Sequence, residues 1–164
     1  MKRFKVISLY IAFILFSTTS FSQSTESDIP ISELPSSVEK VLQQYIEILR
    51  SPNLDIVAEK FVAIAGGSLI NTDGSDLSRG KKEFSLKKDF DDLQHYAYPI
   101  KITRVNKAES NGQGYGATAI KGVVYKIWID KKSSDLGMPA PISIMVPEGH
   151  ATIKTPKVVN IGSL

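Results

Sequence analysis

Cysteine is missing from this chain, and histidine is nearly so. Without cysteine the fold contains no disulfide, and no lipid can be attached to a cysteine at a processing site. His95 and His150 are the two histidines. A zinc site needs three or four converging nitrogen or sulfur ligands. We therefore expect no metal, and the sequence indicates no cofactor.

Recognisable catalytic motifs are absent as well. No Gly-x-Ser-x-Gly pattern stands between a strand and a helix, where a serine nucleophile would be exposed. Gly112, Gly114 and Gly116 form a glycine-rich stretch, but a strand-like segment follows it. Phosphate-binding loops need a helix N-terminus at that place. The stretch is predicted to be a hairpin loop, and the sequence favours a non-catalytic protein.

The N-terminus has the pattern of a secretory signal peptide. Three basic residues lie within the first five positions, and segment 6–16 after them is almost entirely apolar. Small residues at Ser20 and Ser22 match the site that a signal peptidase cleaves. A membrane-spanning helix needs roughly 20 apolar residues, so this segment is too short for an anchor. We predict removal of residues 1–22, a mature chain that starts at Gln23, and export to the periplasm or the extracellular space.

The charge balance depends on that cleavage. The whole chain has 20 Lys and Arg residues against 17 Asp and Glu residues, and residues 1–22 hold three of the basic residues and no acid. The mature chain is left with 17 residues of each sign and no formal net charge. Nucleic-acid binding requires a basic face. Nucleic acid is therefore not an expected partner.

The mature chain is predicted to form one domain over residues 36–164. Residues 23–35 are polar and contain two prolines, which indicates a flexible lead-in. The three- and four-residue spacing of apolar residues then predicts three helices. They run from a Ser36–Glu39 capping box to about Arg50, from an Asn53 cap to about Ile64, and from a Ser85 cap to about Ala97.

Beyond residue 97 the apolar period changes to two, which predicts strands. They are expected at 100–103, 117–130, 142–146 and 150–161, with a further short candidate at 68–71. Helices followed by hairpin-linked strands are typical of an α+β fold, an antiparallel sheet covered on one face by helices.

This order of elements resembles the NTF2-like (SnoaL-like) superfamily. Val38–Arg50 forms a tyrosine-bearing first helix, and segment 51–61 adds a short break and a second helix that ends in Phe61. The resemblance implies a cone of three helices packed in a curved, mostly antiparallel sheet. Enzymes of the superfamily line the cone with acids or histidines. Here the second helix leads into Ala63–Gly67, which contains neither, and this departure weakens the enzymatic interpretation.

Four residues are candidates for ligand binding inside such a cone: Tyr45, Asp89, Tyr96 and Tyr125. Tyr45 lies in the apolar stripe of the first helix and Tyr125 on the apolar face of the longest strand. A buried tyrosine is most often a core residue whose hydroxyl finds a partner, which is the alternative. Asp89 and Tyr96 flank the stripe of the third helix, and an ion pair of Asp89 with a lysine is the alternative there.

A histidine–carboxylate dyad of His95 with Asp91 or Asp92 is a weaker hypothesis. At about 100° per residue these three side chains fall away from the apolar stripe of the third helix. They are predicted to form a solvated helix face.

The second face of the longest strand contains Val124 and Trp128. If the helices cover the other face, this one is left for solvent or a partner. We expect Val124 and Trp128 to form a homodimer interface, or Trp128 to be covered by the lead-in.

These observations predict an exported, non-catalytic domain that binds a small apolar ligand or a partner protein. One alternative is an enzyme with isomerase-, cyclase- or hydrolase-type chemistry that uses Asp89 and the tyrosines. Another is a structural interaction protein of the cell envelope without a pocket. A buried carboxylate that faces a polar partner would favour the enzyme.

Overall fold

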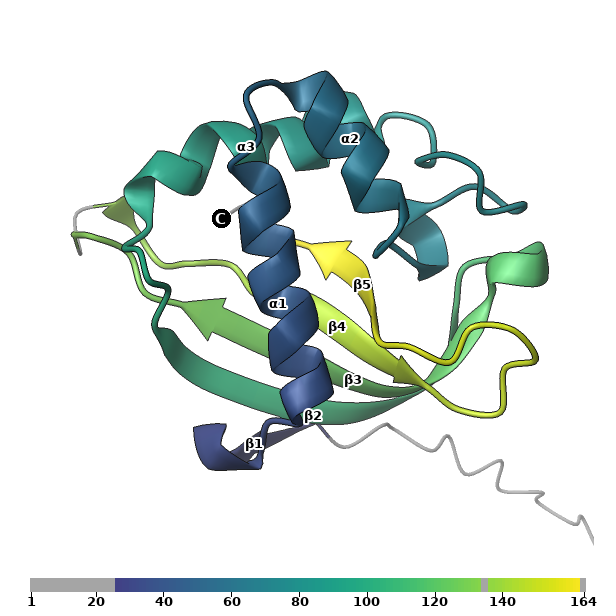
Figure 1. Cartoon of the computed structure of the whole chain (residues 1–164). Coiled ribbons are helices and arrows are strands. Elements are labelled where there is room, and N and C mark those ends of the chain that lie inside the picture. The colour runs from purple at the N-terminus through teal and green to yellow at the C-terminus, as the bar shows by residue number, and fades with distance from the viewer. Residues whose placement is uncertain (1–25, 134–135, 163–164) are drawn as a thin grey trace, which may run out of the picture.

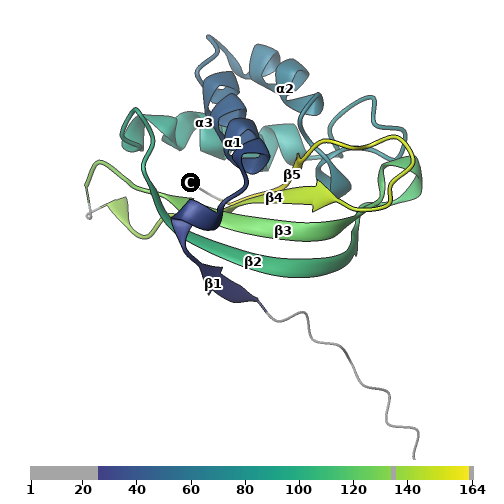
Figure 2. The same cartoon turned by 60° about the horizontal axis from the view of Figure 1, so that its bottom comes forward.

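The computed structural model describes residues 26–133 and 136–162. The predicted signal peptide, its cleavage site and the first residues of the lead-in lie outside the described residues. A short strand, β1, precedes three helices and four more strands follow them, and all five form one open antiparallel sheet in the order β1-β2-β3-β4-β5, which confirms the α+β fold (Figure 1). Figure 2 shows the helices together on one face of the curved sheet.

The first two helices confirm the sequence prediction. Helix α1 spans Ser36–Leu49 and buries one face in the core. Helix α2 spans Leu54–Val62, and the Asn53 side chain caps it by accepting a hydrogen bond from the Ile56 amide at 3.0 Å. The predicted capping box of α1 is wrong. Ser36 is the first helical residue, and the Pro35 carbonyl accepts hydrogen bonds from the amides of Val38 and Glu39.

The third helix is longer at its start and less regular than its periodicity predicts. A π-helical segment, Lys81–Leu86, runs directly into α3, Lys87–Asp92, and a 3₁₀ turn follows at Leu93–His95. The predicted Ser85 cap is therefore wrong, because Ser85 lies inside the π-helical segment. A π turn contains more residues than an α turn, so the phase drawn from α-helical spacing does not hold here. Asp89, predicted at the edge of the buried stripe, is fully buried.

The strand predicted at 142–146 is confirmed as β4, whereas the other strands begin or end at different places from those expected. Strands β2, β3 and β4 span Ile102–Gln113, Ile120–Ile129 and Ile142–Pro147. The last strand, β5, is Lys157–Ile161, and the predicted start at His150 lies in the loop before it. Pro156 directly precedes β5, where its missing N–H costs no sheet hydrogen bond. The candidate strand at 68–71 is also wrong, because Gly67–Leu69 is a 3₁₀ turn.

The lead-in is not a flexible tether over its described part. Ser27–Ile29 forms β1, which pairs with β2 opposite Val105–Lys107. On the sheet face away from the helices, the Glu26 carboxylate accepts hydrogen bonds from Asn106 Nδ2 at 2.8 Å and Lys126 Nζ at 2.5 Å. Backbone pairing and these charge-assisted contacts hold the segment against the sheet.

Both faces of the sheet are partly buried by this chain alone. Tyr125, Ile127 and Ile129 of β3 face the helices, as predicted. On the other face a smaller apolar cluster contains Ile120, Val124, Met145 and Val159, with Ile153 of the β4–β5 loop packed against it. Val124 is only 5 % exposed within this cluster. A dimer interface on this face would thus depend on Trp128 rather than on Val124.

Trp128 is half-buried beside its register partner Arg104. The Arg104 guanidinium lies 4.7 Å from the centroid of the indole ring, and Asp28 of β1 pairs with it at 2.8 Å. The lead-in thus contacts Arg104, which stacks on Trp128, and no direct contact of the lead-in with the indole ring is seen among these interactions. Within residues 26–133 and 136–162, no helix has the length and apolar character needed to cross a membrane.

Candidate functional site

A pocket of about 330 Å³ lies between the C-terminal half of α1, the end of the third helical segment and the chain that leads into β2. Six of its lining residues are apolar or aromatic and form its walls, and four carry polar or charged groups. The first set is Ile46, Phe90, Leu93, Tyr96, Ala97 and Ile100, and the second is Arg50, Gln94, Tyr98 and Lys132. This mixture is typical of small-molecule sites.

The wall residues are deeper in the protein than the charged ones. Ile46 and Tyr96 are buried, whereas Arg50 and Lys132 are exposed. Because long basic side chains keep their charged ends in water, the pocket has an apolar interior and a cationic mouth.

Tyr98 stands at that mouth in a fixed position. Its side chain is 62 % exposed, yet its hydroxyl and one face of its ring contact residues at the end of α1. The phenol donates a hydrogen bond to Glu47 Oε1 at 2.7 Å, and the Arg50 guanidinium lies 3.9 Å from the ring centroid. The bond to the Glu47 carboxylate raises the pKa of Tyr98. An exposed aromatic ring that is held in this way is ready to contact a ligand.

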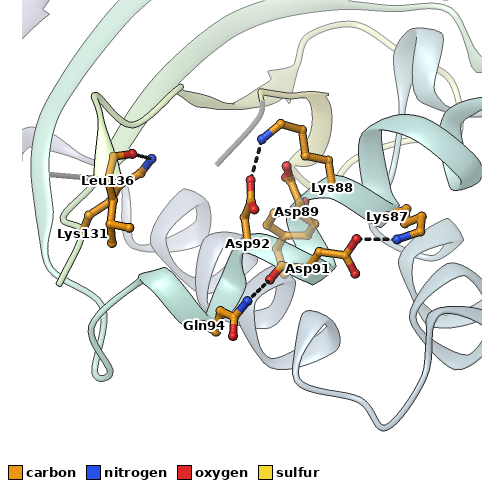
Figure 3. A network of polar contacts seen from close by, with 9 residues as sticks. Lys87, Lys88, Asp89, Asp91, Asp92, Gln94, Lys131 and Leu136 are labelled. Carbon is orange, nitrogen blue, oxygen red and sulfur yellow. Dashed lines mark hydrogen bonds and ion pairs between the residues drawn. The ribbon is translucent and has the colours of Figure 1, made fainter. Parts of the chain in front are cut away.

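Tyr96 forms part of the inner wall. It pairs with Lys131 through an isolated β-bridge, and the Lys132 amide donates to the His95 carbonyl at 2.9 Å. The Lys131 ammonium lies 5.6 Å from the Tyr96 ring centroid and donates to the Leu136 carbonyl at 3.0 Å (Figure 3). These contacts attach the loop after β3 to the pocket wall.

The Tyr96 hydroxyl is a buried polar group with no hydrogen-bond partner in the described part of the chain. Burial, together with the negative charges of Asp89 and Asp92, raises the pKa of its phenol. An unpaired buried hydroxyl costs free energy of about 1 to 3 kcal/mol. A ligand or a water molecule that paired with it would remove that cost.

Asp89 lies behind this wall, fully buried, and accepts a hydrogen bond from the Tyr45 hydroxyl at 2.5 Å. Burial first, and then the Asp89 charge, raises the pKa of Tyr45. Three of the four candidate ligand-binding residues, Tyr45, Asp89 and Tyr96, thus lie in one region. Only Tyr96 lines the pocket. Tyr125, the fourth, is packed in the core on β3.

The lysines next to Asp89 have other partners. Lys87 pairs with Asp91 and Lys88 with Asp92, each one helical turn away (Figure 3). Both aspartates predicted to lie on a solvated face are in these ion pairs. Gln94, at the pocket, donates from Nε2 to the Asp91 carbonyl at 3.1 Å. Elsewhere in the described residues, no group of three or more His, Asp or Glu side chains is arranged to hold a metal ion.

Tyr96 is the one lining residue that the sequence named as a candidate for ligand binding, and Arg50, Tyr98 and Lys132 at the mouth were not predicted. Arg50 ends α1 and Tyr98 precedes β2, and the contact between these elements joins residues about 50 positions apart. No local spacing predicts such a contact. The Tyr98-Pro99 pair after an amphipathic segment was an available signal, but only for a break in the helix.

Known proteins give no assignment, because no protein-family profile, no curated protein and no solved structure matches this chain. The fold and the site define its class. It is an α+β protein whose helices and sheet enclose an apolar core. A small pocket with two cations at its mouth lies at one end of the helical layer.

Proposed function

We propose that this protein is an exported, non-catalytic NTF2-like domain that binds a small apolar ligand in the pocket beside α1. The element order, three helices and then four of the five strands of an open antiparallel sheet, is compatible with the cone of that superfamily. The pocket carries the functional part of the proposal, because its walls are apolar and one of its aromatic rings is held exposed at the mouth.

The size of the pocket suits one small molecule. Ligand sites in proteins have volumes of about 300 to 1,000 Å³, and this pocket is at the lower end with about 330 Å³. Apolar surface that the ligand buries contributes about 25 cal/mol for each Å². Binding is therefore expected to need a ligand whose apolar part is small enough to enter this volume.

Filling the pocket tests this function. Ala97 lines the wall, so Ala97→Leu is expected to weaken the binding of the neutral dye N-phenylnaphthylamine by about tenfold, since the added side chain takes up ligand space. Ala151→Leu, in the exposed β4–β5 loop, is the matched control and should bind as the wild type does. Absence of dye binding to the wild type, or equal binding by Ala97→Leu, contradicts the proposal.

Native mass spectrometry gives a second test without a chosen ligand. Protein purified from its own host is expected to carry an additional small mass that Ala97→Leu lacks. N-terminal sequencing of the same exported protein should begin at Gln23. A sequence that begins at Met1 would refute the export part of the proposal and leave the pocket part standing.

The buried Asp89–Tyr45 pair favours an enzyme as a second candidate. A desolvated carboxylate beside a phenol is a common arrangement for acid–base chemistry. Asp89 does not line the pocket, so a substrate would have to displace part of the Tyr96 wall to reach it. Mass spectrometry of the ligand recovered after incubation separates the candidates. A ligand changed by the wild type but unchanged by Asp89→Asn would establish the enzyme.

A further inference from the structure

Although the walls of the pocket are mostly apolar, its lining carries a net positive charge. Its lining contains two cations, Arg50 and Lys132, and no carboxylate. The ion pairs formed within residues 26–133 and 136–162 involve neither of them. Both side chains are exposed, and the Arg50 guanidinium is stacked on the Tyr98 ring instead of meeting an acid.

Three acids of α1 and α3 contact other groups. Glu47 accepts a hydrogen bond from the Tyr98 phenol, and Asp92 pairs with Lys88. Asp91 pairs with Lys87. No carboxylate lines the pocket itself, so an incoming anion would meet two cations there, with the Glu47 charge on the outer side of the Tyr98 hydroxyl.

We propose that the ligand of this pocket is an amphipathic anion, a molecule with an apolar body and one carboxylate head. The inference rests on the proposed function, that the pocket binds a small apolar ligand, and it specifies the chemical class. The apolar body lies against Ile46 and the Tyr96 ring, and the carboxylate meets Arg50 and Lys132 at the mouth.

The two cations have different parts in this recognition. A guanidinium presents paired N–H groups that match both oxygens of a carboxylate, and its stacking on Tyr98 limits the freedom that binding would otherwise remove. Lys132 adds a single point charge on the opposite element, the loop after β3. Its backbone is held by the bond to the His95 carbonyl, so the side chain projects from a fixed position.

The charge at the mouth also sets the direction of the ligand. Because the inner wall is buried and its one polar group is the Tyr96 hydroxyl, a carboxylate placed there would lose its water without gaining a cation. The head at the mouth keeps both water and two positive partners. The tail then fills the interior, where its burial stabilises the complex.

The test compares decanoate with 1-decanol, which have the same chain length and differ in head-group charge. Each is used to displace N-phenylnaphthylamine from the full mature protein, at a pH where the carboxylate is ionised. Decanoate is expected to displace the dye at a concentration about tenfold lower than decanol, because charge-assisted hydrogen bonds to two cations are available only to the anion. Added salt should reduce this difference.

Variants of the two cations test whether Arg50 and Lys132 cause the preference for decanoate. Arg50→Gln and, independently, Lys132→Gln are expected to weaken decanoate about three- to tenfold each and to leave decanol unchanged. Lys40→Gln removes an exposed cation elsewhere on α1 and is the matched control. Equal displacement by decanoate and decanol, or decanoate binding that neither variant weakens, overturns the inference. Failure of the dye to bind at all overturns the proposed function instead.

Discussion

The hydroxyl of Tyr45 donates a hydrogen bond of 2.5 Å to the Oδ2 atom of Asp89, and both side chains are fully buried. The bond joins α1 to α3 across 44 positions of the chain. A buried carboxylate must be compensated by donors, because its transfer from water is costly. The first helix therefore supplies one of the groups that allow the third to bury an acid.

The raised pKa values of two buried tyrosines predict a loss of stability at alkaline pH. The pKa of Tyr45 is well above its ordinary value, and that of Tyr96 is raised as well. In the unfolded chain both phenols ionise near pH 10, so their contribution is fully present below about pH 10 and is lost as pH rises toward the folded-state pKa values. Each contributes a slope of up to about 1.4 kcal/mol per pH unit.

Urea unfolding at a series of pH values between about 8 and 11 measures this slope. Tyr45→Phe should make the alkaline fall shallower than in the wild type, even though it lowers stability at neutral pH by about 1 to 3 kcal/mol. Tyr115→Phe is the control, because Tyr115 is 79 % exposed. The same slope in Tyr45→Phe and the wild type would contradict a raised pKa at Tyr45.

Two helix starts of similar sequence are expected to respond differently to alanine. Asn53→Ala removes the side-chain cap of α2 and should lower the free energy of unfolding by about 1 kcal/mol. Ser36→Ala removes no cap, since Ser36 is already helical, and should stay within about 0.5 kcal/mol of the wild type. Denaturant unfolding of both variants measures the two changes in the free energy of unfolding. A loss of stability larger than this in Ser36→Ala would show that the Ser36 side chain does cap α1.

Gly114 is expected to be intolerant of any side chain for a reason that Gly137 does not share. Both have left-handed φ angles, 84° and 76°. A Cβ at Gly114 would lie 2.7 Å from the Gly67 carbonyl, whereas one at Gly137 meets nothing within 4 Å. Gly137→Ala should cost about 1 to 2 kcal/mol from backbone strain alone. Gly114→Ala should cost about 1 to 3 kcal/mol more, from the clash. Thermal unfolding compares them, and equal losses would rule out the close approach to Gly67.

Trp128 remains the residue on which a homodimer would depend. One side of its ring faces Arg104, and covering the rest of such a side chain contributes about 1.5 to 3 kcal/mol. Trp128→Glu should convert a dimer to a monomer without loss of the helical circular dichroism signal. Tyr115→Glu, at another exposed aromatic, should not. Sedimentation at micromolar concentration gives the answer, and a wild-type protein that sediments as a monomer would contradict the homodimer expected from the sequence.

Local sequence determined the elements that depend on neighbours along the chain. The spacing of Val38, Leu42 and Tyr45 predicted α1, and Asn53 predicted the start of α2, because a helix is stabilised by residues three and four positions apart. The alternation of Tyr125, Ile127 and Ile129 predicted which side of β3 faces the helices, since side chains of a strand alternate between faces.

Tertiary structure alone decided the rest. The π-helical segment before α3 turned Asp89 into the core, toward a tyrosine of another helix. Ile153 of the β4–β5 loop packs against the cluster that buries Val124. The polar segment before Pro30 pairs with β2 and thereby becomes the edge strand β1. The pocket joins Arg50 to Tyr98 and Lys132. Each of these results depends on contacts between segments that are distant in sequence. Patterns within a short stretch of residues do not report the free energy of such contacts.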